Sequence, residues 1–287
     1  MISYDFDYYK PTTYQEAVHI YQQAEANGQE PLYYAGGTEI ISMARLMQLR
    51  TGAVIDIKAV PECNVLHIYG EQLVIGAAIT LTTLSESPIF PLLADTARRI
   101  ADHTNRNKIT VGGNLCGKFI YREALLPFLL ADSQVVLMGP NGIRHVSVHQ
   151  VLNGQPQLAK GELVLQILTD KRVIDLPYFT VKKTKMEKID YPIVRISALR
   201  TKEGIRIAFS GVSAVPFRSR MIEDILNEVS LPLEERIERI IRIWPFPILN
   251  DILSSAAYRT FVLRNTIIET VAALEGGVDN HGWNSQM

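Results

Sequence analysis

The chain has 287 residues, of which 47% are hydrophobic, and its formal net charge is -1 at pH 7. This length suits one large domain or two to three small ones. The small charge excludes a general electrostatic attraction to nucleic acid or anionic membranes. No secretory signal is recognisable at the start, and no apolar run approaches the roughly 20 residues that span a bilayer. The sequence therefore predicts a cytoplasmic protein with no membrane span.

Cysteine and histidine are sparse. Cys63 and Cys116 are the two cysteines and lie far apart, which is too few for a disulfide scaffold and fits a reducing compartment. An iron–sulfur cluster usually takes four thiolates, so this chain cannot hold one alone. His145 and His149 are separated by residues typical of a strand or turn, and we interpret them as polar surface. No metal site is predicted.

The first predicted unit, residues 1–57, alternates helices and strands. Thr13 and Glu16 form the pattern of a capping box, which marks a helix start. The expected elements are a helix from Tyr14, a strand at 32–35, a Gly36-Gly37 turn, a helix from Ile40 and a strand at 53–57.

The second predicted unit covers residues 58–172. Two apolar runs flank Gly70-Glu71, as in a hairpin. The expected elements are strands at 65–69 and 73–77, a helix at 92–103, a glycine loop at 112–117, a helix at 123–131, strands at 134–138 and 143–146 around the turn 139–142, and a closing strand at 163–168.

The third predicted unit, residues 177–276, combines an antiparallel sheet with helices, and 277–287 is expected to be a flexible tail. Three strands are predicted, at 178–183, 193–199 and 205–215. Three helices follow, at 219–228, 233–243 and 254–275, the last ended by Gly276-Gly277. The fold class is therefore α+β.

Two glycine-rich segments are candidates for binding phosphate. In Tyr34–Ile40 a strand turns into a helix through Gly36 and Gly37, and glycine lets backbone amides approach a ligand closely. Such a turn alone is more often only a tight connection between a strand and a helix. The second segment, 106–118, also contains neighbouring glycines, and it has more polar side chains around them, notably Thr110 and Asn114.

Two common nucleotide motifs fail here. Gly112 to Lys118 satisfies the first seven positions of a P-loop, but Phe119 stands where a magnesium-binding Ser or Thr is required. The strand at 134–138 offers no acidic partner. A GxGxxG fingerprint is absent, so a flavin or nicotinamide would not be held in the Rossmann manner.

Taken together, the two segments resemble the FAD-binding medium subunit of molybdenum hydroxylases, the family of xanthine and carbon monoxide dehydrogenases. The family patterns A-G-G-T-[DE]-[LI] and R-N-x-x-T-[IV]-G-G-N match residues 35–40 and 106–114. The likeness continues in order at 161–164, at 178–194 and at Ala256–Arg259. Each motif is modest, but the ordered set over about 4–276 is specific.

The resemblance implies two α/β subdomains of the vanillyl-alcohol-oxidase-type fold that hold FAD between them, with the C-terminal α+β domain covering it. It also implies non-covalent FAD, because a buried thiol is commoner at Cys116 than a covalent attachment point. The residues it assigns to the cofactor are Tyr34, Ala35, Gly36, Gly37, Thr38, Glu39 and Ile40 at the diphosphate, Thr110, Gly113, Asn114 and Cys116 as the second wall, Val164 near the flavin–adenine region, and Lys182 near the isoalloxazine. A solvated strand lysine is the alternative for Lys182.

The chain departs from the family pattern after the second segment. The family usually has A-S-P-x-x-D, whereas residues 118–123 read K-F-I-Y-R-E. Glu123 stands at the position of the Asp and is expected to contact the cofactor. For Arg122, a phosphate contact and a surface salt bridge are both open.

By resemblance, the chain is an oxidoreductase subunit that passes electrons from [2Fe-2S] clusters to an acceptor such as NAD. A small subunit would carry these clusters and a large subunit the molybdenum cofactor, in a dimer of heterotrimers, and no catalytic residue is assigned to this chain. Two alternatives stay open, a self-contained flavin oxidoreductase of the same fold and a flavin-free structural subunit. The sequence does not name the substrate.

Overall fold

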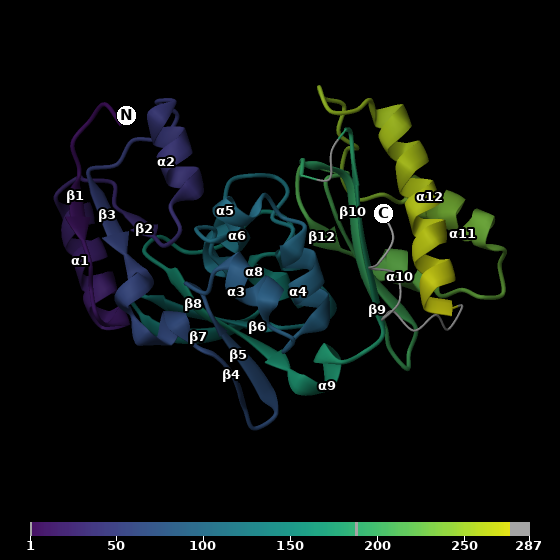
Figure 1. The fold of residues 1–287 in the computed structure, drawn as a ribbon, viewed down its shortest axis with the longest axis horizontal. Helices are drawn as coiled ribbons and strands as arrows, with labels where there is room; N and C mark the ends of the chain where they lie inside the picture. The colour runs from purple at the N-terminus through teal and green to yellow at the C-terminus, as the bar shows by residue number, and fades with distance from the viewer. Residues whose placement is uncertain (1, 187–188, 276–287) are drawn as a thin grey trace.

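The computed structural model describes residues 2–186 and 189–275. Three sheets follow one another along the long axis of the molecule (Figure 1), with three, five and four strands in chain order. One apolar core extends under the first two sheets and a second core, within residues 181–271, lies under the third. No helix among the described residues is long and apolar enough to cross a membrane.

The first sheet is parallel, with the order β1-β3-β2, and supports the first glycine turn. Its strands are β1 (Asp7–Tyr9), β2 (Leu32–Tyr34) and β3 (Ala53–Asp56), and its helices are α1 (Tyr14–Ala26) and α2 (Thr38–Arg45). The three-residue edge strand β1 was not predicted. Thr13 caps α1 as expected, but Glu16 accepts the amide of Thr12 at 2.8 Å, so the predicted reciprocal bond to the Thr13 amide is replaced.

The second sheet is antiparallel, with the order β4-β5-β8-β6-β7. Its strands are β4 (Leu66–Tyr69), β5 (Gln72–Gly76), β6 (Gln134–Gly139), β7 (Gly142–Ser147) and β8 (Leu163–Asp170). The hairpin across Gly70-Glu71 is confirmed, since Tyr69 pairs with Gln72. The expectation that the strand at 163–168 closes the sheet is wrong. It lies at the centre because its nearly continuous apolar sequence is buried on both faces.

Short helices connect and cover the second sheet. They are α3 (Leu81–Glu86), α4 (Pro91–Arg98), α5 (His103–Arg106), α6 (Val111–Cys116), α7 (Leu125–Leu130), α8 (Val148–Val151) and α9 (Lys171–Ile174), with 3-10 turns at Ile57–Ala59 and Pro61–Asn64. The helix predicted at 92–103 ends at Arg98, because Ala101 takes a positive φ of 51° that interrupts helical geometry.

The glycine loop predicted at 112–117 is also wrong in its local structure, because most of the segment belongs to α6. Thr110 is the N-cap of this helix, and its hydroxyl accepts the amide of Gly113 at 3.3 Å. Thr110 bridges to Thr80 in the extended segment before α3. Bonds to another part of the chain therefore fix the short helix despite its two glycines.

The third sheet has four strands rather than the predicted three. They are β9 (Tyr178–Thr184), β10 (Pro192–Arg200), β11 (Ile205–Ser210) and the two-residue β12 (Phe217–Arg218), in the order β12-β11-β10-β9. The helices α10 (Arg220–Leu226), α11 (Leu233–Arg242) and α12 (Ala256–Glu275) lie beside this sheet, farthest from the first unit (Figure 1). The predicted stop at Gly276-Gly277 and the tail at 277–287 lie outside the described residues.

Asp132 joins the second and third units through one histidine and two arginines. His149 Nε2 lies 2.7 Å from Asp132 Oδ1, Arg218 donates to the same oxygen at 2.7 Å, and Arg206 forms an ion pair with Oδ2 at 2.9 Å. Burial by itself raises the pKa of Asp132, but the His149 hydrogen bond and the two arginines lower it to about 2. His149 is thus in hydrogen-bond contact with this carboxylate, and no group of three possible metal ligands occurs among the described residues.

Candidate functional site

The first glycine turn presents backbone donors that the protein itself does not use. Gly37 adopts a left-handed φ of 71° and precedes α2 without a side-chain cap. Within the described chain, the amides of Thr38, Glu39 and Ile40 make no hydrogen bond to protein, and the first amide of this region with a backbone acceptor is that of Ile41. Free amides at the positive end of a helix dipole favour an anion such as a diphosphate.

Lys58 adds a cation to this turn, and the sequence did not reveal it. Its Nζ donates to the carbonyl of Ala35 at 2.9 Å and to Asp56 at 2.6 Å, and it lies 4.5 Å from the centroid of the Tyr34 ring. The Asp56 carboxylate is buried and also accepts the Tyr8 hydroxyl. A lysine two residues after β3 carries no sequence signal of its own, since only the parallel pairing of β2 and β3 brings it to the turn.

The two glycine segments touch each other, as the resemblance requires of a shared site. A Cβ on Gly36 would lie 1.9 Å from the carbonyl oxygen of Lys108, so the backbones are in contact there. The carboxylate of Glu39 accepts the amides of Lys118 at 2.7 Å and Phe119 at 3.4 Å. Glu39 thereby ties α2 to the segment that follows α6.

The second segment presents an open backbone surface at Gly113, and its amides are hydrogen-bonded within the protein. The amides of Val111 and Gly112 donate to Ile79 and Ala77 at 2.8 and 2.9 Å, and that of Gly113 to Thr110. A Cβ on Gly113 would meet only the Thr110 hydroxyl, at 3.0 Å. Gly113 therefore presents an open backbone face, while the donors of this helix are already paired.

Polar side chains near the end of α6 connect it to the next segment. Asn114 Oδ1 accepts the amide of Ala124 at 3.1 Å, which leaves the side-chain NH2 for other partners. Burial raises the pKa of the Cys116 thiol to about 12, so the sulfur is a thiol at neutral pH and a poor nucleophile.

The departing segment, 118–123, buries two of its charged residues, Arg122 and Glu123, and leaves Lys118 exposed. Arg122 is 3% exposed and donates to the carbonyls of Leu115 and Gly154, so both the phosphate contact and the surface salt bridge are wrong. The Glu123 side chain is also buried, and its Oε1 accepts Lys182 Nζ at 3.1 Å.

Lys182 is a buried lysine rather than the solvated alternative. Its side chain is 3% exposed, and Nζ also donates to the carbonyl of Arg99 at 2.9 Å. Burial lowers the pKa of Lys182, and the Glu123 carboxylate opposes this shift. Arg195, a fully buried cation on β10, approaches the same carboxylate at 3.8 Å. An arginine within the apolar run 193–199 was the available signal for this residue.

Val164 lies apart from the glycine segments, in the central strand β8. It is 5% exposed, pairs with Leu137 and belongs to the apolar core. The next residue, Leu165, accepts the amide of Ala77, whose own carbonyl accepts Gly112. Val164 therefore supports the second wall from behind.

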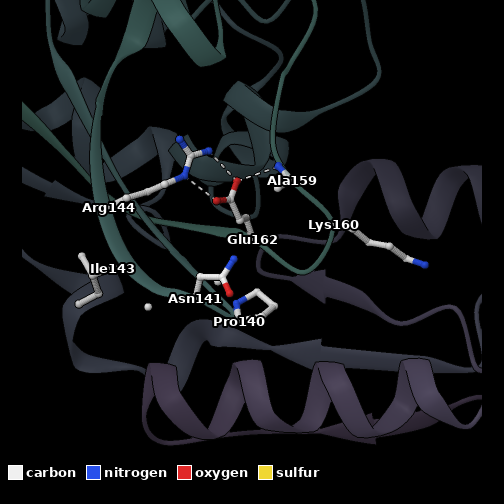
Figure 2. A pocket seen from close by; sticks show the side chains of 9 residues that line it. Pro140, Asn141, Ile143, Arg144, Ala159, Lys160 and Glu162 are labelled. Carbon is white, nitrogen blue, oxygen red and sulfur yellow. Dashed lines mark hydrogen bonds and ion pairs between the residues drawn. The ribbon is translucent and has the colours of Figure 1, made fainter.

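A separate pocket of about 290 Å³ lies between the β6–β7 turn and residues 159–162 (Figure 2). Arg144 and Glu162 line it and neutralise each other through bonds of 2.6 and 2.8 Å. Lys160 extends away from this pair (Figure 2) and bonds Glu25 at 2.6 Å. The charges of the residues that line this pocket are therefore paired with protein groups.

The structure thus brings a helix N-terminus with free backbone amides into contact with a second glycine-containing segment. Residues 4–169, more than half of the chain, match the FAD binding domain in molybdopterin dehydrogenase. The chain belongs to this family, as the FAD-binding medium subunit of a molybdenum hydroxylase and hence an oxidoreductase subunit.

Individual relatives agree with this placement. The chain is 28% identical to the carbon monoxide dehydrogenase medium chain of Hydrogenophaga pseudoflava over 76% of this chain and 78% of the relative. It is 26% identical to the nicotine 6-hydroxylase medium subunit of Paenarthrobacter nicotinovorans over 83% and 89%. A solved carbon monoxide dehydrogenase chain from H. pseudoflava, from an enzyme lacking the Mo-pyranopterin moiety, superposes with a TM-score of 0.86 at 26% identity, over 96% of this chain and 99% of that one.

Proposed function

We propose that the chain binds FAD non-covalently and passes electrons through it from a partner's [2Fe-2S] clusters to an acceptor such as NAD. The observation that carries this proposal is the set of three free amides at the start of α2, next to the contact of Gly36 with Lys108 in the second glycine segment. The flavin would supply the redox chemistry, and the protein would position it and tune its potential.

In this proposal the cofactor-binding residues form two sides of the site. The turn from Tyr34 to Ile40 holds the diphosphate, with Glu39 fixing the geometry between the segments. Thr110, Gly113 and Asn114 form the opposite wall, with Cys116 packed behind it. Val164 stays proposed near the flavin–adenine region and Glu123 as a cofactor contact, although Val164 pairs with Leu137 in β8 and Glu123 also pairs with Lys182.

The partners follow from what the chain lacks chemically. Two cysteines cannot ligate an iron–sulfur cluster, so electrons would reach the flavin across a subunit interface. We propose a small [2Fe-2S] subunit, a large molybdopterin subunit and a cytoplasmic dimer of heterotrimers. The domain limits 1–57, 58–172 and 177–276 belong to the same proposal, and the second core, confined to residues 181–271, supports the last of them.

The test combines flavin binding with purification of the complex. FAD at ~1,000 times its dissociation constant stabilises the folded chain by roughly 4 kcal/mol, so the melting temperature rises, with a smaller effect of FMN. Affinity purification from the native host recovers a small cysteine-rich chain and a larger molybdenum-containing chain. No flavin in the purified complex indicates the structural subunit, and substrate turnover by the chain alone indicates the self-contained oxidoreductase.

A further inference from the structure

The buried side chains of Lys182, Glu123 and Arg195, here called the charge triad, are incompletely paired. Glu123 Oε2 and the Nε and Nη1 atoms of Arg195 have no hydrogen-bond partner in the described chain, although all three are buried. Arg195 Nη2 reaches Thr180 Oγ1 at 3.1 Å, and its Nε stays 3.8 Å from Glu123. Two cations thus share one carboxylate, which leaves a formal charge of +1 with little access to water.

Such an arrangement is costly for a protein that uses it only as a support. Buried polar atoms are almost always hydrogen-bonded, and apolar side chains of similar volume often replace a buried ion pair without loss of stability. The neighbouring anions do not remove the excess positive charge, because Asp95 and Asp190 are partly exposed and therefore screened, and the exposed Arg99 is another cation. The excess charge therefore calls for a functional explanation.

The triad lies directly beside the cofactor site. Glu123 is held between Arg122, which donates to the carbonyl of Leu115 in α6, and Ala124, which donates to Asn114 in α6. Glu39 in α2 accepts the amides of Lys118 and Phe119, which belong to the same segment as Glu123. The segment 118–123 therefore connects the start of α2 to the triad.

We propose that the charge triad is an electrostatic device that raises the reduction potential of the bound flavin, with Glu123 and Arg195 as positioning residues for Lys182. This inference rests on the proposed function, since it needs FAD in the glycine site. Reduction adds two electrons to the flavin ring, and the reduced ring carries more negative charge than the oxidised ring until protons follow. A fixed positive charge nearby stabilises the reduced ring more strongly.

The proposal predicts that the flavin potential follows the net charge of the triad. Lys182→Met brings the triad to 0, Glu123→Gln brings it to +2, and the double variant restores +1. We expect the potential to fall for Lys182→Met, to rise for Glu123→Gln and to stay near the wild-type value in the double variant. Each single change should shift the oxidised–reduced equilibrium at least tenfold, which is about 30 mV for a two-electron couple.

The matched control is Lys183→Met, which removes the next lysine on β9. Lys183 pairs with Glu269 on α12, and both side chains are about 40% exposed, so its loss should leave the potential unchanged. The potentials are measured by equilibrium titration of the flavin absorbance against a reference dye, with FAD affinity and melting temperature recorded for every variant. If Glu123→Gln alone does not fold, Lys182→Met and the double variant still test whether the flavin potential falls at a triad charge of 0 and returns to the wild-type value at +1.

The possible outcomes separate the inference from the function beneath it. Wild-type protein that holds no flavin overturns the proposed function and this inference with it. Protein that binds FAD but whose potentials do not follow the triad charge, or move equally in Lys183→Met, overturns the inference alone. A simple structural role would change the melting temperatures without this opposite pair of shifts in potential.

Discussion

Gly113→Ala should strengthen the empty fold and weaken FAD binding. In the structure, Gly113 is an interior residue of α6, and an added Cβ meets only the Thr110 hydroxyl, at 3.0 Å. Alanine in a helix is favoured over glycine by about 0.5–1 kcal/mol. The tight contact of the new methyl with the Thr110 hydroxyl offsets part of this stabilisation. On the open side, the same methyl enters the space proposed for the cofactor, where overpacking costs about 1–3 kcal/mol. The dissociation constant for FAD should therefore rise about 5- to 150-fold.

The contrasting variant is Gly112→Ala, one residue earlier in the same helix. Its Cβ would lie 2.6 Å from the Cβ of Ala77, inside the core. This variant should therefore destabilise the FAD-free chain, whereas Gly113→Ala should stabilise the chain and weaken FAD binding. Denaturant unfolding of the FAD-free chain and fluorescence titration with FAD measure the two quantities. Normal FAD binding by Gly113→Ala would refute the reasoning, because α6 would then be only a packed connection.

Three further variants or treatments test other parts of the structure. Asp132→Asn should lower the free energy of unfolding by about 1–3 kcal/mol, because Arg218 and Arg206 lose a charged acceptor. The depressed pKa of Asp132, about 2, means that its contribution is present above about pH 4 and is lost as the pH falls towards 2, which urea titrations at several pH values measure. Cys116, whose pKa is about 12, should react with iodoacetamide at pH 8 far more slowly in folded than in unfolded protein, and mass spectrometry would contradict this if both rates were equal. Glu39→Ala should weaken FAD binding by about 1–3 kcal/mol, because two backbone amides lose their acceptor, and unchanged binding would remove Glu39 from the site.

Local signals in the sequence were sufficient for most of the elements and for the family. The strand–Gly-Gly–helix turn at 34–40 was predicted because glycine and helix periodicity act over a few neighbouring residues. The segment 112–117 was predicted as a loop for the same reason, since glycine lowers helix propensity. Its helix depends on partners far along the chain, Ile79 and Ala77, which accept its first amides.

What the sequence by itself determined was the presence of two glycine segments, their order and the charged residues available around them. The tertiary structure alone decided which glycine faces are open. Gly36 is packed against Lys108, whereas Gly113 has free space beside it. It also placed Glu123 between Lys182 and Arg195, which are separated from it by 59 or more residues. Hydrogen bonds, burial and steric contact depend on distances in space, and only the assembled sheets bring such remote residues together.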